Sequence, residues 1–367
     1  MKRPFLGKRQ FCIVSVFLVI LLCIPLMGWK ESAAEVKKLK WAHFVPENDP
    51  ASGLLKEMVK AIETYTKGAV EIKLYWPGQL AETKELPELC KKGSIEITST
   101  APVYYPSTFP LNSSTQMLPV VFKSTEQSIY DWRGLFRDIP EVQSEYAKEN
   151  QYCLNRASLS MYSVISKKPL LTRGDFKGMK IRPFPGKYFT KIMEGAGAVP
   201  TILPIAELYE SLMRGTLNAI MVNEQYMVSL KLYEVAKNVS LLVGTNIGWH
   251  ININLDVWKS FSPEIQNAFI RAATEWGAKD LELSLRIRQE CIDQLKAKGV
   301  QFLEFNQKDW EAMLAEAGDP WEAGKALLTD EFKVDPALAN RFINRWHELN
   351  DEYASKYMAT GKQWKYE

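Results

Sequence analysis

One long helix constrains the fold more than any other feature of this sequence. Ser262-Pro263-Glu264 is typical of a helix start, because serine caps a helix and proline is tolerated at its first position. From there to Lys298 only Gly277 interrupts the helical pattern. At ~1.5 Å per residue this helix is about 50 Å long, which exceeds the diameter of one small domain. The chain beyond residue 34, about 330 residues, is long enough for two lobes with separate cores.

The N-terminus has the three parts of a secretory signal. Basic residues come first, an apolar run covers 11–27, and Ser32-Ala33-Ala34 supplies the small residues of a cleavage site. We therefore expect a signal peptide over residues 1–34 and a periplasmic protein. An uncleaved membrane anchor is the alternative, because the apolar run is near the lower length limit for crossing a bilayer. Cys23 lacks the small preceding residue of a lipoprotein signal.

The net charge excludes one class of partner. The formal charge of the whole chain is +3, but residues 1–34 carry five basic side chains and one acidic one. Without them the remaining chain is close to −1. The excess of basic side chains therefore lies in the expected signal peptide, and we expect no nucleic-acid binding.

Strand and helix patterns alternate over the first part of the mature chain. We expect strands at Leu39–Phe44, Val70–Trp76 and Ile95–Thr100. A helix capped by Ser52 follows the first strand, and a second helix covers Thr83–Lys92. This alternation indicates crossover units and a mostly parallel sheet, an α/β architecture.

The middle of the chain has the pattern of a crossing between two lobes. After a helical block over residues 125–148, the segments Gln151–Arg156 and Met161–Ser166 are predicted strands that lead into a second lobe. Trp249–Asn254 is a predicted return strand, and the sequence from Gln307 onward is helical. We expect the first lobe to comprise residues 35–160, the second lobe 161–248, and the return to the first lobe 249–367.

A lone arginine ends the short predicted strand Gly178-Met-Lys-Ile-Arg182. Ile181 precedes it and Phe184 follows, so the guanidinium enters an apolar setting. A guanidinium stays charged at physiological pH, and its planar fork of donors matches a carboxylate two-on-two. The alternative is a structural salt bridge to an acid such as Glu207 or Glu224.

The arrangement of motifs around this arginine resembles the solute-binding proteins of TRAP transporters, the DctP family. The resembling segments follow in the family's order along nearly the whole chain beyond the leader: Lys40–Pro50, Tyr75–Leu80, Gly93–Ile97, Leu118–Phe122, Asp175–Glu224, and Ile253–Trp258 with the helix start after it. The resemblance implies a two-lobed periplasmic-binding-protein fold with crossing hinge strands and the long helix as a spine. It also implies that Arg182 grips the carboxylate of a small organic acid, which small and large membrane subunits then transport with an ion gradient.

The sequence departs from the family pattern at two places. Where many members carry a second arginine, this chain has Tyr162, and Arg156 could replace that arginine only if the loop differs. One positive charge fewer favours a monocarboxylate over a dicarboxylate. At the family's second polar position, strict register places Val222, and Asn223 follows it; a one-residue slip along a strand reverses the face.

Aromatic residues near the family's pocket segments complete the expected site, with core packing as the alternative for each. His43 ends the first strand, and a structural histidine is the alternative there. The expected substrate-binding residues are Arg182, Tyr162, Phe184, Asn223, Val222, Trp249, Thr100, His43 and Tyr105.

No catalytic motif is present. The sequence has no Gly-x-Ser-x-Gly elbow, no His-Glu-x-x-His pair and no Cys-x-x-Cys, so we expect neither an enzyme nor a cofactor. We expect Cys90, Cys153 and Cys291 to be buried free thiols, with one disulfide as the alternative. A ligand sensor for a receptor kinase and a periplasmic enzyme are the alternative functions. The sequence leaves open whether the ligand is a carboxylate or a sulfonate and whether a metal assists, and monomer is the expected state.

Overall fold

The computed structural model describes residues 36–118, 121–184, 186–203, 205–242 and 248–366. The expected signal peptide over residues 1–34 lies outside this range. Within it, no helix combines the length and the apolar character that crossing a membrane requires.

The first lobe is built on a five-stranded sheet with the order β2-β1-β3-β10-β4. β1 pairs in parallel with both β2 and β3, while β10 is antiparallel to β3 and β4. The first three expected strands and the return strand are therefore confirmed. The sheet is mixed because the return strand, β10, runs antiparallel to its neighbours. The strands are β1 (Lys37–Ala42), β2 (Val70–Tyr75), β3 (Ile97–Thr100), β4 (Gln151–Arg156) and β10 (His250–Asn254).

The second lobe is built on a six-stranded sheet with the order β11-β9-β5-β8-β6-β7. Its strands are β5 (Ser163–Ser166), β6 (Lys180–Arg182), β7 (Val199–Pro200), β8 (Ala219–Val222), β9 (Asn238–Leu241) and β11 (Gln301–Glu304). The expected return of all of residues 249–367 to the first lobe is wrong for one segment, because β11 pairs in parallel with β9. The helix after it, α12 (Gln307–Ala317), packs on α7 (Lys187–Gly195) of the second lobe.

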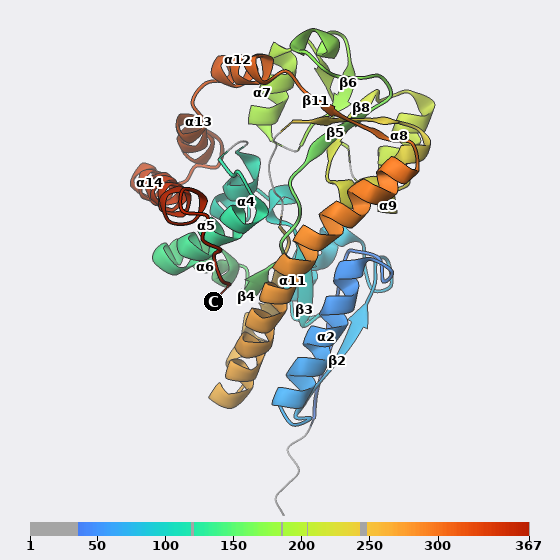
Figure 1. The fold of residues 1–367 in the computed structure, drawn as a ribbon. Helices are drawn as coiled ribbons and strands as arrows, with labels where there is room; N and C mark the ends of the chain where they lie inside the picture. Colours follow the sequence, from blue (N-terminus) through green and yellow to red (C-terminus); the bar gives the residue numbers. More distant parts are fainter. Residues whose placement is uncertain (1–35, 119–120, 185, 204, 243–247, 367) are drawn as a thin grey trace, which may run out of the picture.

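The expected long helix is α11 (Pro263–Ala297), 35 residues long, and the Ser262 hydroxyl caps it by accepting from the Ile265 amide. Figure 1 shows α11 running diagonally from α2 (Pro50–Tyr65) in the first lobe to α9 (Glu224–Ser229) in the second. Lys279 on α11 pairs with Glu57 of α2 at 2.7 Å, and Arg288 pairs with Glu224 of α9 at 3.3 Å. One rigid element therefore contacts both lobes.

The remaining helices cover the sheets and extend the first lobe. The bounds are η1 (Thr83–Glu85), α3 (Leu86–Lys91), η2 (Pro102–Tyr104), α4 (Pro110–Met117), α5 (Thr125–Asp138), α6 (Pro140–Lys148), η3 (Arg173–Phe176), η4 (Ile205–Glu207), α8 (Leu208–Arg214), η5 (Leu232–Glu234), α10 (Leu255–Lys259), α13 (Pro320–Ala326), η6 (Leu327–Glu331), α14 (Pro336–Tyr353) and η7 (Ala354–Met358).

The expected cap of α2 is wrong by one turn. The Asp49 carboxylate accepts from the Ala51 amide at 2.9 Å, and Pro50 occupies the first helical position. Ser52 lies inside the helix, where its hydroxyl donates to the Pro46 carbonyl at 2.8 Å. Proline fixes a helix-compatible φ and needs no amide partner, so the helix starts there.

The three cysteines among the described residues, Cys90, Cys153 and Cys291, are buried free thiols, as expected.

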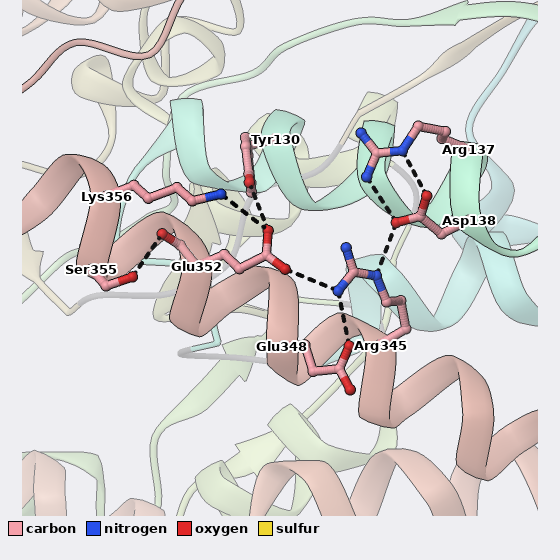
Figure 2. A network of polar contacts seen from close by, with 8 residues as sticks. All are labelled: Tyr130, Arg137, Asp138, Arg345, Glu348, Glu352, Ser355 and Lys356. Atoms are coloured by element: carbon pink, nitrogen blue, oxygen red, sulfur yellow. Dashed lines mark hydrogen bonds and ion pairs between the residues drawn. The ribbon is translucent and has the colours of Figure 1, made fainter.

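A network of polar contacts joins α14 to α5 (Figure 2). The Arg345 guanidinium contacts Asp138 at 2.9 Å, Glu348 at 2.8 Å and Glu352 at 3.0 Å, and Glu352 also accepts from Tyr130. These groups are partly exposed, so the network contributes modestly. The buried apolar cluster of this region includes five α14 residues: Ala339, Phe342, Ile343, Trp346 and Leu349.

The chain crosses between the lobes over residues 157–162, which join β4 to β5. The Ala157 amide donates to the Trp249 carbonyl at 2.7 Å, and the Ser158 amide donates to the Asp280 carboxylate at 2.5 Å. Burial raises the pKa of Asp280 to about 7, opposed by its hydrogen bonds from Ser158. The crossing segment is therefore tied directly to the middle of α11.

This buried carboxyl group predicts a pH effect on stability. The folded pKa of Asp280 exceeds its unfolded value, so its contribution is fully present below pH ~4 and is lost as the pH rises to about 7. We expect the free energy of unfolding of the wild type to fall by about 1 to 3 kcal/mol over this range relative to Asp280→Asn. Urea unfolding at several pH values measures the difference. Asp293→Asn, exposed on the same helix, is the matched control. A flat difference would contradict the assignment.

Candidate substrate-binding site

The Arg182 side chain lies at the end of β6 and is 1 % exposed. Its Nε donates to the Leu203 carbonyl at 3.3 Å and its Nη1 to the Met221 carbonyl at 3.2 Å. Nη2 is buried and has no hydrogen-bond partner among the described residues. Burying a charge without a counter-ion is costly, and the described part of the chain supplies no acceptor for this nitrogen.

The acids that could have neutralised Arg182 are placed elsewhere. Glu224 is fully buried, but its carboxylate accepts from Ser163 at 2.9 Å and pairs with Arg288 at 3.3 Å. Glu207 is exposed on η4. Neither carboxylate forms a salt bridge to Arg182 within the described residues.

The Tyr162 side chain lies near the Arg182 guanidinium, and the Phe184 ring packs on Tyr162. The ring centroids of Tyr162 and Phe184 are 5.6 Å apart, and both side chains are buried. Burial raises the pKa of the Tyr162 phenol well above its ordinary value, the nearby Tyr226 and Tyr104 add to that, and Arg182 opposes it. Tyr162 therefore remains a neutral hydroxyl near the cation.

Asn223 offers a second free donor in the second lobe. Its Oδ1 caps α9 by accepting from the Tyr226 amide at 3.0 Å, which leaves Nδ2 buried and without a partner among the described residues. Val222 pairs with Ser163 across β5 and shares a sheet face with Ile220, the residue opposite Arg182. Strand alternation therefore places Val222 on the arginine face, while Asn223 contributes from the helix cap.

The first lobe contributes an aromatic cluster around His43. The His43 ring lies 4.7 Å from Trp249, 5.5 Å from Phe44 and 6.1 Å from Trp76, and Trp276 of α11 lies behind Trp249 at 5.5 Å. The His43 Nδ1 bonds the Ser99 hydroxyl at 2.7 Å, and burial lowers the pKa of the ring to about 3. The His43 ring is therefore neutral, and its Nδ1 has a structural role through the bond to Ser99. Its buried Nε2 has no hydrogen-bond partner within the described residues.

The two remaining expected residues differ in their surroundings. Thr100 ends β3 opposite His250, and its buried hydroxyl has no partner in the described part of the chain. Tyr105 instead donates its hydroxyl to the Thr83 carbonyl at 3.1 Å, toward the start of α3. Its neighbour Tyr104, not Tyr105, acts electrostatically on Tyr162 and Tyr226. The sequence showed the Tyr104-Tyr105 pair but not which ring faces the second lobe.

A direct contact joins the lobes and was not anticipated from the sequence. The Gln225 Nε2 of α9 donates to both carboxylate oxygens of Asp49, the α2 cap, at 2.9 Å each. Burial raises the pKa of Asp49, opposed by the hydrogen bonds from Ala51 and Gln225. The lobes therefore meet beside the site.

Arg156, the alternative second arginine, belongs to the first lobe. Its Nη1 donates to the Ser128 carbonyl at 3.0 Å. Burial lowers its pKa to about 10, opposed by Tyr146, Asp131 and Tyr366. These neighbours hold it within the first lobe.

No group of three or more His, Cys, Asp and Glu side chains within the described residues is arranged to hold a metal ion.

Comparisons with known proteins identify the family of this chain. Residues 41–324 match the family model of bacterial extracellular solute-binding proteins, family 7. The C4-dicarboxylate-binding periplasmic protein DctP of Rhodobacter capsulatus is 21 % identical over 295 residues, 78 % of this chain and 86 % of that protein. The 2,3-diketo-L-gulonate-binding periplasmic protein YiaO of Escherichia coli is 23 % identical over 279 residues, 76 % of this chain and 84 % of that protein.

Solved structures show the same fold. DctP7 of Bordetella pertussis is an extracytoplasmic solute receptor binding pyroglutamic acid. It matches with a TM-score of 0.74 at 15 % identity, and the match covers 85 % of this chain and 99 % of the DctP7 chain. A TRAP periplasmic solute-binding protein of Desulfovibrio desulfuricans, with bound sn-glycerol-3-phosphate, matches with a TM-score of 0.75 at 19 % identity. This match covers 85 % of this chain and 97 % of that protein's chain. The family model matches well over half of the chain. The protein therefore belongs to family 7 of the bacterial extracellular solute-binding proteins, the DctP-type solute-binding proteins of TRAP transporters.

Proposed function

We propose that this protein captures a small organic acid with one carboxylate in the periplasm and delivers it, as a monomer, to the membrane subunits of a TRAP transporter. The unpartnered Nη2 of Arg182 is the observation that carries the proposal. A carboxylate that accepts from this nitrogen would neutralise the buried charge and satisfy a donor that otherwise has no acceptor. The same step accounts for binding without any catalytic group, so we propose no enzymatic activity.

The balance of charge supports a monoanion. Arg182 is the cation next to Tyr162 and Phe184, and Tyr162 is neutral. Arg156 interacts with first-lobe groups such as Ser128 and Asp131. A second carboxylate would therefore lose its hydration without gaining a cation, which costs affinity.

The other free polar atoms suit a ligand with a neutral polar group. The Asn223 Nδ2 is a buried donor in the second lobe, and the Thr100 hydroxyl is a buried donor and acceptor in the first. The aromatic rings around His43 supply apolar wall. Such a mixture of apolar surface and a few placed polar groups is typical of small-molecule sites. Pyroglutamic acid, the ligand of the Bordetella relative, has this chemistry and is a suitable first probe.

Removal of the cation tests the proposal most directly. In Arg182→Met the apolar stem is kept and the charge is lost, so we expect an unchanged fold and a loss of binding. Thermal-shift assays against a panel of carboxylates and sulfonates measure the effect, since a ligand at a hundred times its Kd adds about 2.7 kcal/mol. Arg214→Met, exposed on α8, is the matched control. Wild-type shifts in Arg182→Met would contradict the proposal.

The preference for a monoanion is tested by calorimetry. We expect pyroglutamate and other monocarboxylates to bind more tightly than succinate or malate by at least about tenfold, equivalent to ~1.4 kcal/mol. The reason is the single guanidinium beside Tyr162. Tighter binding of the dicarboxylates would show that a second cation reaches the ligand.

The contact between the lobes predicts an effect on ligand release. Gln225→Ala removes both hydrogen bonds to Asp49, and a hydrogen bond to a charged group is worth ~1.5–3 kcal/mol. We expect roughly tenfold weaker binding of any ligand found in the panel, mainly through a faster dissociation rate. Stopped-flow kinetics measures it, with Gln289→Ala, exposed on α11, as the control. An unchanged dissociation rate would mean that this contact does not hold the lobes together around the ligand.

A further inference from the structure

The dark red end of the chain lies beside the first lobe (Figure 1). Residues 362–366 are held next to α11 by the side chains of Trp364 and Tyr366. The Trp364 ring packs edge-on against Tyr130 of α5, with centroids 5.7 Å apart. The Arg133 guanidinium lies over the Tyr366 ring at 4.5 Å. The Tyr366 hydroxyl donates to the Asn155 Oδ1 at 2.8 Å. The neighbouring residues 361–363 and Lys365 are exposed, so these two side chains provide the attachment.

Gly277 is explained by this attachment. A Cβ at position 277 would lie 2.2 Å from the Tyr366 hydroxyl and 2.6 Å from the Asn155 Nδ2. Both distances are far below van der Waals contact, so any side chain here would displace Tyr366. Glycine inside a helix costs about 1 kcal/mol relative to alanine. The one interruption of the α11 pattern is therefore the place where Tyr366 inserts.

Tyr366 inserts next to the segment that crosses between the lobes. Asn155 lies in β4, two residues before the crossing segment 157–162, and its Nδ2 donates to the Ala273 carbonyl of α11. Asp280 follows Gly277 by about one turn and accepts from the Ser158 amide. Tyr366 and Asp280 thus contact the same stretch of chain from neighbouring turns of α11. This junction therefore lies next to residues 157–162, where the chain passes from the first lobe to the second.

The tail is not packed tightly on its flanks. Two surface cavities of ≈440 Å³ and ≈650 Å³ adjoin it, and Gln363, Trp364 and Lys365 line both. Detachment of the tail would therefore break the contacts of Trp364 and Tyr366 without unpacking the apolar core of the lobe.

We propose that residues 362–366 form a strap that holds α11 against β4 and restricts opening of the two lobes. In its bound position the strap stabilises the arrangement in which the lobes are in contact; when Tyr366 leaves, α11 is freer to shift along β4 and the open arrangement gains population. The role of the strap depends on the proposed capture function, whereas its position follows from the contacts of the tail alone.

The distance between the lobes tests the strap without any ligand. Spin labels at Lys60→Cys on α2 and Lys308→Cys on α12 report this distance by double electron–electron resonance. Both positions are exposed, and the three cysteines of the described chain are buried. We expect Tyr366→Ala to raise the ratio of longer-distance to shorter-distance molecules about tenfold, because it loses a hydrogen bond and a cation–π contact. Tyr366→Phe, which keeps the ring, should give a smaller increase.

Two further variants make the result specific. Gly277→Ala leaves the tail sequence intact but removes the space for Tyr366, so it should increase the longer-distance population as Tyr366→Ala does. Lys365→Ala, exposed beside Tyr366, should match the wild type. Unchanged distances in both Tyr366→Ala and Gly277→Ala, with wild-type circular-dichroism melts, would overturn the strap. That outcome would not affect the proposed capture function. Ligand binding that persists in Arg182→Met would contradict the capture mechanism but would not affect the strap.

Discussion

The packing of one 35-residue helix against both lobes is the constraint on which the rest of this structure depends. α11 pairs with α2 through Lys279 and Glu57 in the first lobe and with α9 through Arg288 and Glu224 in the second. Between these contacts, Asp280 binds the crossing segment at Ser158. The site between the lobes can therefore change shape only as far as this helix and the crossing segment allow. Gly277, in the middle of α11, is the point at which the tail reaches that junction.

The substrate site depends on a charge that the protein buries and leaves incompletely satisfied. Arg182 donates to two backbone carbonyls, and its third nitrogen has no partner among the described residues. Such an arrangement lowers stability in the free protein. In the function that we propose, a carboxylate ligand would recover that free energy on binding. Glu224 is bound by Arg288 and Ser163, so this nearby acid does not neutralise Arg182.

Local chemistry explains why some features were predictable and others were not. The start of α11 follows from Ser262 and Pro263, which act within one turn of the chain. The cap of α2 was misplaced because Asp49 and Ser52 are both good caps, and Pro50 decides between them. Tyr104 and Tyr105 are equivalent in the sequence. They differ in the fold, where Tyr105 donates to the Thr83 carbonyl and Tyr104 acts electrostatically on Tyr162.

The sequence by itself determined the α/β class, the long helix and the arginine at the end of β6, because periodicity, capping and a lone cation in an apolar strand are local properties. The two-lobed form followed from the resemblance of its motifs to the DctP family. The tertiary structure alone decided that β11 joins the second sheet, that Gln225 meets Asp49 across the lobes, and that Tyr366 fills the space at Gly277. Each of these contacts joins residues from 63 to 176 positions apart. No local preference encodes such pairs, since they form only when burial of the two cores brings distant segments together.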